Sequence, residues 1–219
     1  MSAVADIILV VLVLTGLALL GSTRLAGGIR TAAAQGFVLA LLPLFMHGEG
    51  GGAGIAAWAL ALGSAAIKGF LFPAWLLRAV RETDARREME PFVGPTLSLL
   101  AGLAVLGLAF WVSSRLPLPP SARATLAVPA GLFTVWTGLF LICARRKAVT
   151  QVLGFIILEN GVFTLGVALV RGTPWLIELG VLLDVFVAVF VMGIIVFHIS
   201  REFDHMDADR LAQLKDAPR

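Results

Sequence analysis

Seven long apolar runs, each bounded by charged or turn-forming residues, constrain this chain more than any other feature. A soluble domain carries about 25% charged residues, whereas only 14% of these 219 residues are charged and 59% are hydrophobic. Each run is roughly long enough to cross a hydrocarbon layer of about 30 Å as a helix, and no alternating pattern of membrane strands is present. The runs lie near residues 5–22, 31–47, 54–77, 92–113, 125–144, 148–170 and 175–198. The sequence therefore predicts an all-α integral membrane protein, a bundle of seven transmembrane helices.

The distribution of basic residues predicts the orientation of the bundle. Thirteen of the 17 lysines and arginines fall in loops on one side or in the tail, three fall on the other side, and Lys68 lies inside a helix. The thirteen are Arg24, Arg30, Arg78, Arg81, Arg86, Arg87, Arg145, Arg146, Lys147, Arg201, Arg210, Lys215 and Arg219. Because basic loops stay in the cytoplasm, the N-terminus is expected outside and the C-terminus inside. We expect a multi-pass protein of a bacterial-type cytoplasmic (inner) membrane.

Several function classes are excluded by the same pattern. The net charge of +3 comes from short interhelix loops, so no region is expected to bind nucleic acid. Cys143 is the single cysteine, which rules out an intrachain disulfide and a cysteine-ligated iron–sulfur cluster. The glycine-rich run at 47–54 lacks the Lys-Ser/Thr of a phosphate loop. We expect no cofactor and no metal site in this chain, and its apolar helices face lipid.

Three ionisable residues lie deep inside the predicted spans: Lys68, Glu159 and Asp184. At 1.5 Å per residue, Glu159 lies about 16 Å from the cytoplasmic boundary, Lys68 about 15 Å from it, and Asp184 about 14 Å from the outer one. In a core of about 30 Å these three depths converge near the midplane. The sequence therefore predicts that the three residues share one level of the bundle.

Two interpretations of these charges remain open. Intramembrane ionisable groups mark ion pathways, and burial with a charged neighbour allows such groups to exchange protons. In that interpretation Lys68, Glu159 and Asp184 form a proton relay. Alternatively, Glu159 pairs with Lys68 as a structural ion pair, and Asp184 accepts hydrogen bonds from a neighbouring helix. The residues Asn160, Gln35 and Thr164 are predicted to hold bridging waters.

A resemblance to known families rests on two segments. The stretch TGLFLICARRKAVTQVLGFIILENGVFTLG, followed by a helix with a mid-membrane acid and the ending VFHISRE, resembles chain K of respiratory complex I and the matching small subunit of multisubunit sodium/proton antiporters. With its additional N-terminal helices, the whole chain resembles the hydrogenase-4 component E family, membrane subunits of formate hydrogenlyase-type complexes. In chain K, two membrane-embedded acids belong to a hydrophilic axis for protons, and Glu159 and Asp184 are the matching positions. Glu159 stands about three positions later than the family's glutamate, and Asp184 replaces the usual glutamate.

The resemblance also implies partners and a division of the chain. The expected units are residues 1–90, a three-helix unit with a cytoplasmic loop, 91–124, a linking fourth helix, 125–200, a chain-K-like unit, and 201–219, a cytoplasmic tail. The expected partners are large antiporter-like membrane subunits and the membrane anchor of a soluble hydrogenase-like redox module. We expect a subunit of a proton- or sodium-pumping oxidoreductase complex that is not an enzyme on its own. The alternatives are a purely structural spacer and a free-standing small ion transporter.

Overall fold

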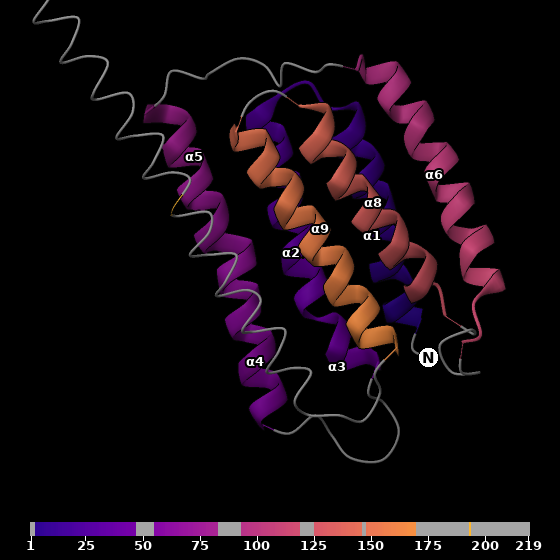
Figure 1. Ribbon diagram of the computed structural model, residues 1–219. Helices are drawn as coiled ribbons and strands as arrows, with labels where there is room; N and C mark the ends of the chain where they lie inside the picture. Colours follow the sequence, from indigo (N-terminus) through magenta and orange to yellow (C-terminus); the bar gives the residue numbers. More distant parts are fainter. Residues whose placement is uncertain are drawn as a thin grey trace, which may run out of the picture.

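The computed structural model describes residues 3–46, 55–82, 93–118, 125–145, 148–169 and 193. Every regular element within these ranges is a helix (Figure 1). The helices are α1 (Ala3–Gly21), α2 (Leu25–Ala40), α3 (Leu42–Met46), α4 (Ile55–Ala66), the π-helical turn η1 (Ile67–Leu71), α5 (Phe72–Glu82), α6 (Pro95–Arg115), α8 (Ala127–Ala144) and α9 (Ala148–Leu169). This confirms the all-helical prediction for the described part of the chain. The predicted helix at 175–198 lies, apart from residue 193, outside the described residues.

Four of these helices are long and apolar enough to cross a membrane: α1, α6, α8 and α9. They match four of the predicted spans to within three residues at each end, so a membrane protein is confirmed at this level. Helices α1, α8 and the α4–α5 segment run in one direction, and α2, α6 and α9 run in the other (Figure 1). This alternation is the arrangement that short connections between successive spans produce.

The second predicted span, 31–47, differs from the structure in both its start and its continuity. Helix α2 begins at Leu25, six residues earlier, and it ends at Ala40, where the chain breaks before α3. Pro43 accounts for the break, because a proline has no N–H to donate and its ring clashes with the carbonyl four residues before it. The N–H of Leu41 instead bonds to Val38 O at 3.2 Å, a tightened final turn.

The third predicted span, 54–77, forms one continuous helical segment from Ile55 to Glu82, divided by the π-helical turn η1. It extends five residues beyond the predicted end, into a stretch that contains Arg78 and Arg81. Basic residues thus lie within the last turns of α5 as well as in the loop after it. Both this segment and α2 are interrupted beside a proline, Pro73 and Pro43 respectively, where a helix is expected to kink.

Helices α8 and α9 form the closest pair in the described structure because glycines face the opposing backbone. A Cβ added at Gly138 would collide with the backbone N of Leu158, and one added at Gly161 would collide with the backbone N of Val135. Small residues that let two backbones approach are typical of helix contacts inside membranes. The contact fixes α9, which carries Glu159 and Asn160, firmly against α8.

The buried apolar residues form two clusters with a polar layer between them. The first cluster contains Leu19 of α1, Ile29 of α2 and Ile157 of α9. The second contains Leu12, Leu39 and Ala168 of the same three helices. The polar residues lie between these positions along each helix: Thr15 on α1, Gln35 on α2, and Glu159, Asn160 and Thr164 on α9. A polar level therefore crosses the interior between two apolar ends.

Candidate functional site

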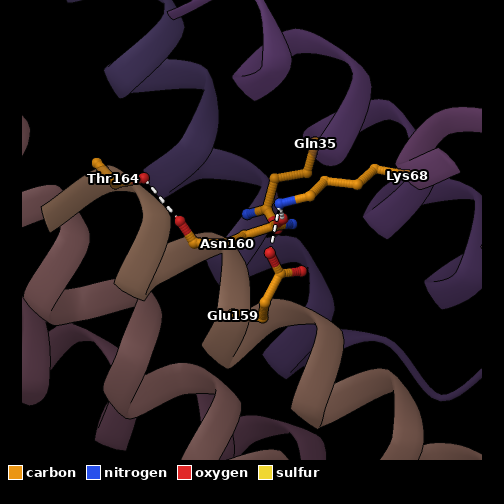
Figure 2. A network of polar contacts seen from close by, with 5 residues as sticks. All are labelled: Gln35, Lys68, Glu159, Asn160 and Thr164. Carbon is orange, nitrogen blue, oxygen red and sulfur yellow. Dashed lines mark hydrogen bonds and ion pairs between the residues drawn. The ribbon is translucent and has the colours of Figure 1, made fainter. Parts of the chain in front are cut away.

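A buried ion pair between Lys68 and Glu159 is the centre of the polar layer. The Nζ of Lys68 lies 2.5 Å from Oε1 of Glu159, and both residues are 2% exposed. The two residues are 91 positions apart in the chain and come from η1 and α9 (Figure 2). The depths expected from helix rise alone are compatible with this contact. Two charges removed from water in this way are held by each other and by the neighbouring polar groups.

Lys68 projects from a local irregularity in its helix. In η1 the N–H of Phe72 bonds to Ile67 O, five residues back instead of four. Pro73 comes directly after Phe72. In a regular helix the proline ring would clash with the carbonyl of residue 69, and the widened turn accommodates the ring. Single π-turns of this kind occur frequently at functional sites. The register of Lys68 relative to α9 is thus set by this turn.

Gly36 of α2 gives Lys68 the room it needs. A Cβ added at Gly36 would lie 2.8 Å from Cβ of Lys68, and no real pair of such atoms is this close. The glycine therefore allows α2 and η1 to approach each other at the level of the ion pair. One residue earlier on α2, Gln35 is 1% exposed and points into the same polar layer.

Two amide side chains extend the ion pair toward α1. The Nζ of Lys68 donates to Oδ1 of Asn160 at 3.5 Å, and Nδ2 of Asn160 donates to Oε1 of Gln35 at 3.2 Å. The Nε2 of Gln35 donates to Oγ1 of Thr15 at 3.1 Å and to the carbonyl of Leu12 at 3.2 Å. Figure 2 shows Lys68 and Gln35 extending from separate helices toward Asn160 and Glu159. Of the predicted supports, Asn160 thus bonds directly to both Lys68 and Gln35, and Gln35 continues to α1.

Thr164, the third predicted support, has a local role in the structure. Its Oγ1 donates to the backbone carbonyl of Asn160, one turn earlier on α9, at 2.8 Å (Figure 2). This bond keeps a buried hydroxyl satisfied within its own helix. Thr164 lies beside the amides and is not part of their chain. Asp184, the third residue of the predicted relay, lies outside the described residues, so its place in a relay stays a prediction.

Two contacts of the site were not anticipated from the sequence. The Nζ of Lys68 lies 4.7 Å from the centroid of the Phe163 ring, within the range of a cation–π interaction. Thr15 of α1 accepts from Gln35 and directs its own hydrogen to the carbonyls of Val11 and Leu12. The sequence contained an indication of the cation–π contact, because Phe163 stands four residues after Glu159 and therefore lies on the same face of the helix.

Arg145, counted among exposed loop charges in the sequence, is buried in the structure. It is 1% exposed, and its Nη2 donates to Leu20 O at 3.4 Å. Burial lowers the pKa of its guanidinium, which still remains charged because an arginine starts from so high a value. The last carbonyls of a helix lack partners and carry the negative end of its dipole, so Arg145, at the end of α8, caps α1. In its burial it differs from Arg24, Arg30 and Arg78, which are exposed.

Within the residues that the structure describes, no three His, Cys, Asp or Glu side chains gather as metal ligands do. The chemistry that the described site supports is that of a buried ammonium–carboxylate pair. A carboxylate at this level can take up a proton or a cation, and the lysine holds a compensating positive charge beside it.

Similar proteins give the chain a family. It is 34% identical over 208 residues, 94% of this chain and 93% of the other, to an uncharacterized protein of Mycobacterium tuberculosis. It is 32% identical over 150 residues, 68% of each chain, to "Hydrogenase-4 component E" of Escherichia coli K12. The chain belongs to the hydrogenase-4 component E family. The same identity and coverage relate it to the component E of Shigella flexneri. No family model and no solved structure matches the chain, and the likeness to chain K of complex I stays a prediction.

Proposed function

We propose that this chain is a non-catalytic membrane subunit of a hydrogenase-type, energy-converting complex related to complex I or to multisubunit antiporters. Membership of the hydrogenase-4 component E family supports a role within a multi-subunit complex. The outer face of α6 supports it further, because Leu97, Leu100 and Leu103 are exposed on a helix that packs mainly along α1 and α8 among its described neighbours. We propose antiporter-like subunits and the anchor of a hydrogenase-like module as partners, with lipid covering the remainder.

We propose the predicted topology with it: seven spans, the N-terminus outside and the C-terminus in the cytoplasm of a bacterial inner membrane. The units 1–90, 91–124, 125–200 and 201–219 remain the proposed division. Reporter fusions after residue 90 and at the C-terminus should both report the cytoplasm. An external C-terminus would contradict the arrangement.

Within the complex, the proposed role of the chain is to contribute buried charged groups to a lateral proton or sodium path. The ion pair of Lys68 and Glu159 is the observation that carries this proposal. A fully buried carboxylate beside a buried ammonium is a costly arrangement for a site that only fills space. In the proposed path Glu159 exchanges the ion, Lys68 compensates its charge, and Asp184 is the next acid along the route.

The variant Glu159→Gln tests the path. It keeps the shape and hydrogen bonding of the side chain while removing its charge and titration, so the complex should assemble and retain its redox activity in detergent. Ion pumping in proteoliposomes should fall at least tenfold. The matched control is Thr134→Val on α8, which removes a fully buried hydroxyl that bonds only within its own helix in the described structure. Full pumping by a well-assembled Glu159→Gln complex would refute the path.

A structural clamp is the second candidate, and the direct 2.5 Å contact between η1 and α9 favours it. If the pair only holds these helices together, removing one partner leaves an uncompensated charge and costs about 3–5 kcal/mol. Glu159→Gln would then block assembly, and adding Lys68→Met would restore both assembly and pumping. In a path, the doubly substituted complex assembles but still does not pump.

A further inference from the structure

The amides of Asn160 and Gln35 form a hydrogen-bonded ladder that runs from Lys68 to the backbone of α1. Its direction is fixed at both ends by chemistry. A lysine ammonium can only donate, so Asn160 must turn its oxygen toward Lys68, and the carbonyl of Leu12 can only accept, so Gln35 must turn its nitrogen toward α1. The rung between them, from Nδ2 of Asn160 to Oε1 of Gln35, results from these two constraints.

Every bond in the ladder therefore points away from the ammonium. Each amide presents its oxygen toward Lys68 and its nitrogen toward α1, and the hydroxyl of Thr15 continues the series to the carbonyl of Val11 at 2.7 Å. Hydrogen bonds aligned in one direction polarise one another and strengthen the electrostatic effect of each. The negative ends of these dipoles face a positive charge.

We infer that the Asn160–Gln35–Thr15 ladder holds Lys68 as an ammonium when the carboxylate of Glu159 is neutral. This rests on the proposed function in one respect, that Glu159 takes up a proton or cation during transport. Such uptake cancels the negative charge next to Lys68 and so removes the support that this charge gives the ammonium. The ladder keeps the lysine charged through that step, while the proton or cation is exchanged at Glu159.

The groups around the ammonium agree with these two roles, ion exchange at Glu159 and charge support by the ladder. Helices α1 and α2 contribute the neutral side chains of Thr15 and Gln35 to the ladder, and α9 contributes Glu159, Asn160 and the ring of Phe163. Glu159 is the titratable group among these. Primary amides donate and accept hydrogen bonds but do not titrate, so the ladder is a support for charge and not a conduit for protons. Asn160 and Gln35 are positioning residues in this scheme.

A stability cycle on the purified full chain tests the inference without any transport measurement. The variant Gln35→Met keeps volume and removes the ladder's middle member. The half-life of the folded chain at a fixed elevated temperature is measured for Gln35→Met in the native background and again with Glu159→Gln. Hydrogen bonds to charged groups are the stronger ones, so Gln35→Met should shorten the half-life about tenfold more when Glu159 is already neutral.

Two further variants separate a charge effect from a packing effect. Adding Lys68→Met to the Gln35→Met, Glu159→Gln chain should restore most of the lost half-life, because the ammonium that the ladder supports is then gone. Asn160→Leu should show the same coupling as Gln35→Met, while Thr134→Val should cost the same in both backgrounds. Equal costs for Gln35→Met in the two backgrounds, an absent rescue by Lys68→Met, or a chain that does not fold with Glu159→Gln alone would each overturn the ladder. Loss of the proposed function would instead appear as full pumping by the Glu159→Gln complex, whatever the cycle shows.

Discussion

The glycine contact between α8 and α9 allows a quantitative prediction about the packing that positions Glu159. A Cβ at Gly138 would lie 2.6 Å from Cα of Leu158 and closer still to its backbone N. Ordinary contacts begin about 1 Å further out, so Gly138→Ala must separate the two helices by about that distance at this level. A radial gap of 0.5–1 Å forfeits about a quarter to a half of the dispersion energy of the atoms that face it. The colliding atoms are backbone, which cannot rotate away as a flexible side chain can.

We therefore expect Gly138→Ala to cost about 1–3 kcal/mol, the usual range for an overpacked interior. The cost prevails over the gain of about 1 kcal/mol that alanine brings to a helix in place of glycine. The matched control is Gly107→Ala on α6, where an added Cβ meets nothing within 4 Å and only the helix gain remains. Thermal unfolding in detergent, followed by circular dichroism, measures both. If the two variants unfolded at the same temperature, the tight α8–α9 contact would not hold α9 in place.

Two more variants probe the site and its surroundings. Gly36→Ala should displace Lys68 and reduce pumping by the complex at least tenfold, whereas Gly63→Ala on α4, where the added Cβ meets nothing within 4 Å, should leave pumping in proteoliposomes unchanged. Arg145→Met removes the cap on the last turn of α1 and should lower the free energy of unfolding by about 1–3 kcal/mol, the cost of leaving a buried acceptor unpaired. Exposed Arg115, which lies over a tryptophan ring, is the control, and Arg115→Met should change the unfolding temperature by much less.

The ion pair illustrates how far the sequence leads. Lys68 and Glu159 could be placed at one depth because helix rise is constant and each run has a visible boundary. Depth does not specify which helix faces which, so the pairing was one of two open interpretations. Asn160 and Gln35 were recognised as supports, but their direct contact depends on how α2 packs against α9, a property of two helices together.

Arg145 shows why other features were missed. It stands in the run Arg145-Arg146-Lys147, and a charge run between two apolar helices is typical of an exposed loop. Its burial depends on the end of α1 lying beside it, 125 residues away in the chain. The glycine spacing on α8 and α9 was visible in the sequence, at Gly131 and Gly138 and again at Gly154 and Gly161. Seven-residue spacing places each pair on one face of its helix, yet only the fold reveals that these two faces meet.

The turn η1 connects this packing to the chemistry of the site. A regular helix through Pro73 would lose a hydrogen bond and force the proline ring against a carbonyl one turn earlier, at a cost of about 3 kcal/mol or more. The π-turn removes that clash by bonding Phe72 to Ile67, and an extra residue in a turn rotates the helix before it relative to the helix after it. Lys68 lies within the widened turn, so the same backbone change that accommodates Pro73 determines where the lysine points. Because Gly36 leaves space on the facing helix, the lysine can use that direction to reach both Glu159 and Asn160. A proline, a glycine and a lysine on two helices thus act together, and the position of the buried charge depends on all three.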